Sequence, residues 1–154
     1  MMMHLCCDVI SKLQNRTLVT AESCTGGGIG AALTAVPGSS AVYKGGIICY
    51  TNWVKENILG VDSKLLSEKG AVSAEVAKAM AVGARNYLQA DIAVSVTGLA
   101  GPSGDEYGNL VGTVFIGFAD CKEAVAKEYH FAGDRESVRK LATETALRIV
   151  LEHI

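Results

Sequence analysis

The feature that most constrains the fold is a change of hydrophobic period within residues 17–30. Residues 18–21 are a short apolar run of the kind found in β-strands, whereas Ile29 and Leu33 have helical spacing. Small hydroxyl residues and glycines fill the segment between them. A strand that passes through such a turn into a helix directs backbone N–H groups at one point, which suits an anion or a developing oxyanion.

Two potential nucleophiles, Ser23 and Cys24, lie in the middle of this turn. The same residues also suit a purely structural connection, in which Ser23 or Thr25 caps the helix and the glycines allow close packing. A cysteine in such a turn is either a reactive thiol or a small buried residue, and we expect Cys24 to pack. The turn by itself leaves the catalytic and the structural interpretation open.

Helical and strand patterns alternate along the rest of the chain before a late pair of strands. The periodicity predicts helices at residues 5–14, 28–35, 51–60, 63–69, 73–88 and after 133–139, and strands at 17–21, 47–50, 91–97, 111–119 and 124–131. The strand at 91–97 is almost continuously apolar, which indicates burial on both faces. We therefore predict one α/β domain over residues 1–154, a three-layer α/β/α sandwich with a mixed, mostly parallel central sheet.

Composition excludes several classes of partner. The 154 residues are 49% hydrophobic and carry a formal net charge of −2, with no stripe of lysine and arginine, so we expect no nucleic-acid partner. No apolar run approaches the roughly 18 residues of a membrane span. The N-terminal segment lacks the pattern of a signal peptide, so we expect a cytoplasmic protein.

Cysteine and histidine usage gives no metal or disulfide pattern. The five cysteines have irregular spacing and form no Cys-x-x-Cys pair, and the three histidines are scattered. No Walker A loop or dinucleotide-binding glycine pattern is present either. We expect neither a metal nor a cofactor.

A serine nucleophile in this chain needs a base other than histidine, because no histidine is placed for a Ser–His–Asp triad. Lys55 and Tyr50 are the remaining candidates: a lysine whose pKa is lowered can deprotonate a serine, and Tyr50 could position a substrate or bridge Ser23 and Lys55. The alternatives are a solvated helix lysine and an exposed edge tyrosine.

A second glycine-rich loop, residues 98–108, follows the buried strand at 91–97, where α/β sheets form ligand sites. Arg135 and Arg139 lie at the start of the last helix, and Arg135 could bind a phosphate through two parallel hydrogen bonds. The alternative for Arg135 is a surface ion pair with a neighbouring carboxylate.

Ordered motifs along nearly the whole chain resemble the CinA C-terminal domain family. The motifs that carry the resemblance are AESCTGG at 21–27, YTN at 50–52 with Lys55, LGV at 59–61, GAVS at 70–73, TGLAGP at 97–102 with Gly104, VGTV at 111–114 and GDR at 133–135. The resemblance implies nicotinamide mononucleotide (NMN) deamidase activity, the hydrolysis of a carboxamide to nicotinic acid mononucleotide and ammonia in pyridine nucleotide recycling. It also implies self-association, and we expect a homodimer.

Carried over residue by residue, the resemblance makes Ser23 the nucleophile, Lys55 its general base and Tyr50 the third catalytic position. Backbone N–H groups of residues 25–27 would hold the oxyanion. The residues that we expect to contact the substrate, apart from these three, are Glu22, Thr25, Gly26, Gly27, Thr97, Gly98, Gly101 and Arg135.

Two departures from the family pattern bear on function. Many relatives carry an N-terminal domain resembling molybdopterin-binding proteins, which these residues do not include. Leu110 also stands where relatives often have proline, which affects the expected substrate loop. The alternative function is a nucleotide-binding regulatory module without turnover, linked to competence or DNA damage.

Overall fold

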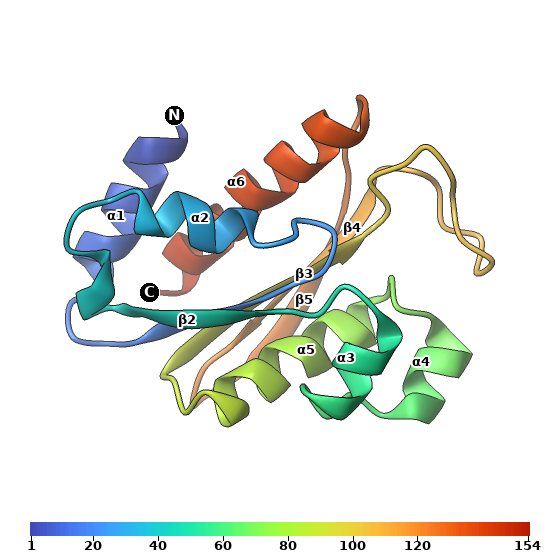
Figure 1. Cartoon of the computed structure of the whole chain (residues 1–154), viewed down its shortest axis with the longest axis horizontal. Coiled ribbons are helices and arrows are strands. Elements are labelled where there is room, and N and C mark those ends of the chain that lie inside the picture. The colour runs from blue at the N-terminus through green and yellow to red at the C-terminus, as the bar shows by residue number, and fades with distance from the viewer.

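The computed structural model describes residues 1–154 and contains a five-stranded sheet between two layers of helices (Figure 1). Its strands are β1 (Leu18–Glu22), β2 (Tyr43–Ile48), β3 (Ile92–Gly98), β4 (Thr113–Ala119) and β5 (Ala124–His130). Their order across the sheet is β2-β1-β3-β4-β5. Strand β1 runs parallel to both of its neighbours, and β4 runs antiparallel to both of its own. The predicted α/β fold with a mixed sheet is confirmed.

The helices divide between the two faces of the sheet. One face is covered by α1 (Met2–Leu13), α2 (Gly28–Thr34) and α6 (Arg135–His153), and the other by α3 (Asn52–Asn57), α4 (Ser63–Lys69) and α5 (Ala74–Tyr87). A short 3₁₀ helix (Ser39–Ala41) leads into β2. A 22-residue apolar cluster fills the first interface and a 13-residue cluster the second. None of these helices is both long and apolar enough to cross a membrane.

The parallel strands β2, β1 and β3 end at the same edge of the sheet. Glu22, the last residue of β1, pairs with Ile48 of β2 and with Val96 of β3. The chain leaves β1 through α2 on one face and returns to β3 through α5 on the other, so β1 is a topological switch point. Such points form crevices beyond the carboxyl ends of the strands. Ser23 stands at this position.

The bounds of several elements differ from the prediction, and α1 and β2 are two examples. Helix α1 begins at Met2, ahead of residue 5, and β2 spans Tyr43–Ile48, so the expected strand at 47–50 was placed too late. Gly45 and Gly46 are part of this strand. A Cβ at Gly46 would collide with the Thr20 and Tyr43 hydroxyls. The missing side chain therefore lets this edge strand pack on β1.

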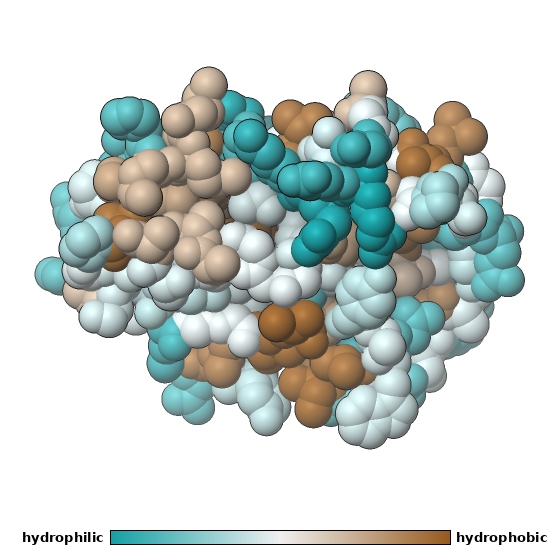
Figure 2. All heavy atoms as spheres, turned by 45° about the horizontal axis from the view of Figure 1, so that its top comes forward, coloured by the Kyte–Doolittle hydropathy of each residue, from teal (hydrophilic) through white to brown (hydrophobic).

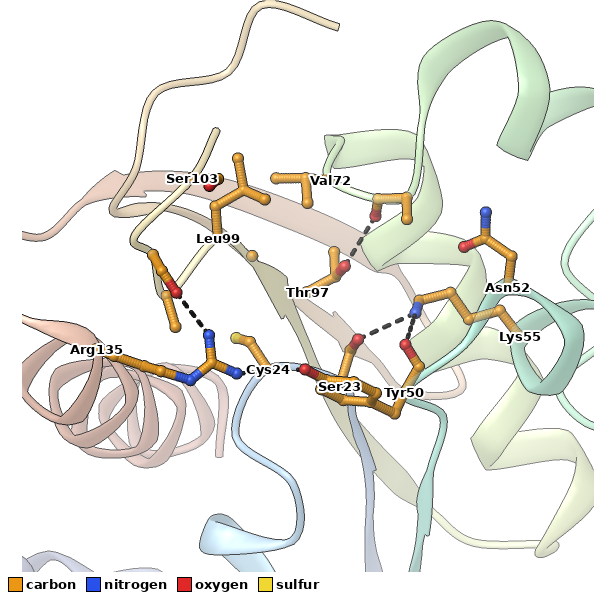
Figure 3. A pocket seen from close by; sticks show the side chains of 14 residues that line it. Ser23, Cys24, Tyr50, Asn52, Lys55, Val72, Thr97, Leu99, Ser103 and Arg135 are labelled. Atoms are coloured by element: carbon orange, nitrogen blue, oxygen red, sulfur yellow. Dashed lines mark hydrogen bonds between the residues drawn. The ribbon is translucent and has the colours of Figure 1, made fainter. Parts of the chain in front are cut away.

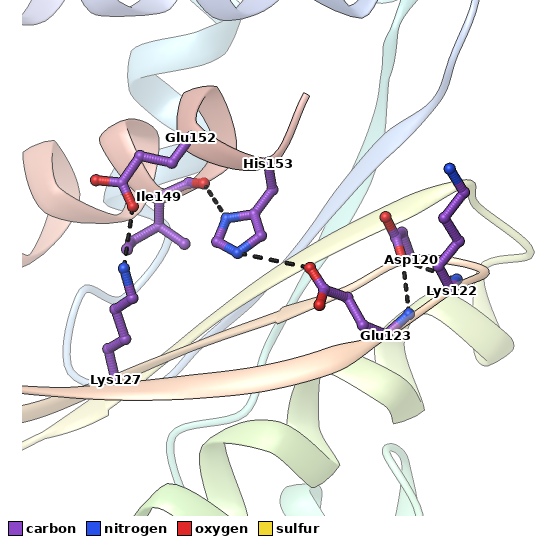
Figure 4. A network of polar contacts seen from close by, with 7 residues as sticks. All are labelled: Asp120, Lys122, Glu123, Lys127, Ile149, Glu152 and His153. Atoms are coloured by element: carbon purple, nitrogen blue, oxygen red, sulfur yellow. Dashed lines mark hydrogen bonds and ion pairs between the residues drawn. The ribbon is translucent and has the colours of Figure 1, made fainter.

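Polar contacts fasten the end of α6 to the β4–β5 hairpin (Figure 4). The Lys127 ammonium lies 3.1 Å from the Glu152 carboxylate, and Nε2 of His153 lies 3.7 Å from Glu123. Asp120 accepts backbone N–H groups in the turn between β4 and β5, and these two strands, expected as a late pair, run antiparallel. Exposed pairs of this kind contribute at most about 1 kcal/mol each, so they align the helix while apolar packing holds it.

Gly83 of α5 tests how tightly the segment after α3 is packed. A Cβ at Gly83 would collide with the backbone carbonyl of Leu59. In an open helix, glycine to alanine stabilises by about 1 kcal/mol. Here we expect Gly83→Ala to lower the free energy of unfolding by roughly 1–3 kcal/mol in denaturant titrations, because the collision forces the two segments apart.

The matched control is Asn86→Ala on the exposed side of the same helix. That variant should remain within about 0.5 kcal/mol of the original chain. A Gly83→Ala protein at least as stable as the control would show that the contact between α5 and Leu59 is loose.

Candidate active site

A cavity of about 280 Å³ opens at the carboxyl edge of β1, β2 and β3 (Figure 3). Its walls come from the ends of these strands, the start of α3, the segment before α5, the glycine-rich loop and the start of α6. The lining residues are Ser23, Cys24, Tyr50, Asn52, Lys55, Ala71, Val72, Thr97, Gly98, Leu99, Ala100, Gly101, Ser103 and Arg135.

Ser23 and Lys55 meet at the base of this cavity. The Lys55 Nζ lies 3.0 Å from the Ser23 Oγ. The backbone N–H of Ser23 donates to the carbonyl of Val96 at 2.9 Å, so β3 fixes the position of the serine. Ser23 is 7% exposed and Lys55 only 1%. This arrangement rules out the solvated-lysine alternative for Lys55.

Helix α3 delivers the lysine because its start is capped. The Thr51 hydroxyl accepts the backbone N–H of Val54, which begins the helix just after β2 and brings Lys55 back over the strand end. The Lys55 Nζ also donates to the carbonyls of Cys49 at 2.8 Å and Tyr50 at 3.3 Å. No carboxylate forms an ion pair with it within 4.0 Å.

Burial shifts Lys55 toward its neutral form. Burial lowers the pKa of Lys55 because the charged form loses its hydration. A neutral amine has two N–H bonds and one lone pair. The carbonyls of Cys49 and Tyr50 can take the two N–H bonds, which leaves the lone pair free to accept the hydroxyl proton of Ser23.

Tyr50 lies at the mouth of the cavity, with 59% of its surface exposed. Its hydroxyl accepts a hydrogen bond from Nη2 of Arg135 at 3.2 Å, and only its backbone carbonyl contacts Lys55. The suggestion that the hydroxyl bridges Ser23 and Lys55 is therefore wrong. The strand ends at Ile48, and the chain then turns so that the Tyr50 ring faces outward.

Arg135 reaches across the cavity mouth from the first residue of α6. Its Nη1 donates to the carbonyl of Gly101 at 2.6 Å, in addition to the bond to Tyr50. Asp134 does not pair with it, because that carboxylate caps α6 by accepting the N–H of Ser137 at 2.9 Å. Hydrogen bonding from the side chain and then from the backbone of Ser137 lowers the pKa of Asp134. The guanidinium thus faces the cavity without a carboxylate partner.

The cavity lining combines polar and apolar residues, and six of its 14 residues are hydrophobic. Ile48 and Trp53, close in sequence to Tyr50, are both more than half exposed but lie outside this lining. Figure 2 shows one face of the molecule on which hydrophobic atoms form separate clusters between hydrophilic ones. A cavity lining of mixed polarity suits a ligand that carries both a ring and a charged group.

The glycine-rich loop forms the far wall. Thr97, Gly98 and Gly101, three of the expected substrate contacts, line the cavity, and the Thr97 hydroxyl donates to the carbonyl of Ala71 at 2.8 Å. Asn109 ties the loop to the segment before α5 by donating to the carbonyl of Val72 at 3.0 Å. These bonds join two segments that are distant in the sequence.

Six lining residues carry no role in the sequence prediction: Asn52, Ala71, Val72, Leu99, Ala100 and Ser103. The only signal for Ala71 and Val72 is that GAVS at 70–73 is one of the family motifs. Periodicity cannot reveal them, because they lie in a connection whose position depends on the packing of α5.

The predicted substrate contacts at the turn after β1 lie outside the cavity lining. Glu22 is 2% exposed, and its carboxylate accepts the Thr25 hydroxyl at 2.8 Å and the N–H groups of Ile29 at 2.8 Å and Gly30 at 3.0 Å. It therefore holds the start of α2. Substrate contact by Glu22, Thr25, Gly26 and Gly27 stays a prediction.

The expected oxyanion donors need one correction. The N–H of Gly26 donates to the carbonyl of Ser23 at 3.1 Å, so it is not free to bind an oxyanion. This bond closes the turn that contains the serine.

Cys24 lines the cavity beside Ser23 but is 7% exposed. Burial raises the pKa of its thiol to about 11, so the thiol is protonated near neutral pH. This agrees with the expected packing role. No group of three or more histidine, cysteine, aspartate and glutamate side chains is placed to hold a metal ion.

Comparison with solved structures supports the fold. The competence-damaged protein (CinA) superfamily protein from Escherichia coli superposes with a TM-score of 0.97 at 35% identity, covering 100% of this chain and 91% of that one. Competence damage-inducible protein A (ComA) from Klebsiella pneumoniae gives a TM-score of 0.95 at 36% identity, covering 98% and 95% of the two chains.

Sequence comparison gives the family. A CinA-like protein from Geobacter metallireducens is 53% identical over 131 residues, which are 85% of this chain and 32% of that protein. The chain spans about a third of the length of the curated relatives it matches. The model of the CinA C-terminal domain matches residues 4–154. The chain therefore belongs to the CinA C-terminal domain family.

Proposed function

We propose that this protein is an amidohydrolase that converts NMN to nicotinic acid mononucleotide and ammonia. The observation that carries the proposal is the 3.0 Å contact between the Ser23 Oγ and a buried Lys55 amine. A lysine in this setting serves as the base for a serine nucleophile when histidine is absent. Family membership supports the substrate class, and the Arg135 guanidinium at the cavity mouth supports an anionic ligand.

The first half of the reaction forms an ester on the serine. The Ser23 Oγ attacks the carboxamide carbon while its proton passes to the Lys55 Nζ, and the carbonyl π electrons move to oxygen. The oxyanion then collapses, the C–N bond breaks and the Lys55 ammonium gives its proton to the leaving nitrogen. Ammonia departs and a nicotinoyl ester of Ser23 remains.

The second half regenerates the enzyme. Neutral Lys55 takes a proton from water, whose oxygen attacks the ester carbon and forms a second oxyanion. When this collapses, the ester bond breaks and the Ser23 Oγ regains a proton from Lys55. The net change is carboxamide plus water to carboxylic acid plus ammonia.

The oxyanion in both halves needs a hydrogen-bond donor near Ser23. We assign this role to the backbone N–H of Cys24. Cys24 follows the nucleophile and lines the cavity, and no backbone carbonyl of the chain accepts its N–H. A donor of this kind typically contributes a factor of about 10²–10³ in turnover.

Substitutions at the turn test the choice of nucleophile and base. We expect Ser23→Ala and Lys55→Met to lower kcat for ammonia release from NMN by roughly 10³-fold or more. Cys24→Ala is the matched control, and it should keep turnover within about tenfold because its thiol only packs.

Loss of turnover in Cys24→Ala with retention in Ser23→Ala would reverse the assignment. Binding of NMN without any ammonia release by the intact chain would instead favour the non-catalytic nucleotide-binding module.

The pH dependence tests the state of Lys55. The base must be neutral, so kcat/KM should rise with pH and level off above the pKa of the free enzyme's lysine. Because burial lowers that pKa, the plateau should begin below the ordinary lysine value of about 10.4. Activity that keeps rising to that value would contradict the assignment.

Arg135 is the proposed contact for the substrate phosphate. We expect Arg135→Ala to raise KM for NMN by roughly tenfold or more, since a charge-assisted pair is lost. Turnover of nicotinamide riboside, which has no phosphate, should change by less than about twofold. Equal losses for both substrates would show that Arg135 acts on the cavity shape and not on the phosphate.

A further inference from the structure

Arg139 reaches the turn of the proposed nucleophile from the outside. It lies one helical turn after Arg135 on α6. Its Nε donates to the carbonyl of Cys24 at 3.0 Å, and its Nη2 donates to the carbonyl of Thr25 at 3.3 Å. Arg139 does not line the cavity, whereas Arg135 does. The two arginines therefore have different partners.

One of the two carbonyls that Arg139 holds, that of Cys24, lies in the peptide unit whose orientation decides the type of the turn. Ser23 and Gly26 close a β-turn through the bond from the Gly26 N–H to the Ser23 carbonyl, so Cys24 and Thr25 are its central residues. The two common turn types differ in the orientation of the peptide unit between the central residues. In this turn, that unit contains the carbonyl of Cys24.

Arg139 therefore restricts a peptide flip beside the nucleophile. The unit is planar and trans, so holding its carbonyl also sets the direction of the Thr25 N–H. A flip by itself would turn the Thr25 N–H and leave the Cys24 N–H in place. The Cys24 N–H shares a planar unit with the Ser23 carbonyl, which the Gly26 N–H holds by closing the turn. A restraint that keeps the turn closed therefore also fixes the direction of the Cys24 N–H relative to the Ser23 Oγ. The proposed oxyanion donor depends on that relation.

The inner side of the same turn is already fixed by another group. The Glu22 carboxylate accepts the Thr25 hydroxyl and two N–H groups of α2. These bonds hold the side chain of Thr25 and the helix start, but none of them contacts the peptide between Cys24 and Thr25. Arg139 supplies the missing restraint.

We infer that Arg139 is a positioning residue for the reaction, which holds the turn after β1 so that the Cys24 N–H faces the oxyanion formed at Ser23. This inference rests on the proposed amide hydrolysis. It predicts an effect on turnover, because an oxyanion donor acts on the transition state more than on the bound substrate.

The test compares Arg139→Ala and Arg139→Lys with Arg148→Ala, a matched control on the same helix. Arg148 approaches Glu144 at 4.0 Å and the Met1 sulfur at 3.9 Å, and it does not contact the turn. With NMN as substrate, we expect Arg139→Ala to lower kcat by roughly tenfold while KM changes by less than about twofold. Arg139→Lys, which keeps one donor, should recover part of the loss. The pH at which activity levels off should stay the same, because Lys55 is untouched.

Hydrogen exchange without substrate provides a readout that does not depend on the activity. The backbone N–H of Gly26 should exchange at least about fivefold faster in Arg139→Ala than in the original chain, because its turn opens more often. The control should leave this rate unchanged, and equal thermal midpoints would exclude general unfolding.

The outcomes separate this inference from the proposed function. Unchanged Gly26 exchange in Arg139→Ala would overturn the positioning role even if the chain hydrolyses NMN. Faster exchange in a chain that releases no ammonia would retain the restraint on the turn and reject the hydrolysis. A rise in KM larger than the fall in kcat would instead place Arg139 in substrate binding and overturn the inference.

Discussion

The contact between Ser23 and the buried amine of Lys55 is the constraint on which the rest of the site depends. A charged ammonium loses its hydration when 99% of its residue is covered, and no carboxylate compensates for that loss. Two backbone carbonyls satisfy the N–H bonds of the neutral amine instead. The fold therefore shifts Lys55 toward its neutral form, which can accept a proton. The Ser23 hydroxyl, which can supply that proton, lies beside it.

This contact exists because of the order of strands in the sheet. Ser23 follows β1, which lies between β2 and β3, and α3 returns Lys55 over the end of β2. On the opposite side, α6 sends Arg135 over the cavity mouth and Arg139 to the back of the turn. Segments from both ends of the chain thus converge on one short turn. Displacement of α6 would change the contacts of Arg135 at the cavity mouth and of Arg139 at the turn together.

The sequence predicted those parts that depend on local pattern or on a family motif. The buried strand at 91–97 corresponds to β3 because its apolar residues are continuous. The helix expected at 73–88 corresponds to α5, whose start the Ser73 hydroxyl caps. The orientation of Glu22 and of the Tyr50 ring could not be predicted in the same way. The former depends on where α2 begins and the latter on how the chain turns after β2, and both are set by contacts between segments distant in sequence.

The protonation state of Lys55 tests the central claim most directly. An NMR titration of the lysine side-chain ¹³Cε signals, with Lys55 assigned by its loss in Lys55→Met, reports the pKa without any substrate. The structure predicts that Lys55 titrates below the ordinary value of about 10.4, because burial disfavours its charged form. A Lys55 signal that titrates at or above that value would contradict the account, since the amine could not then serve as a base near neutral pH.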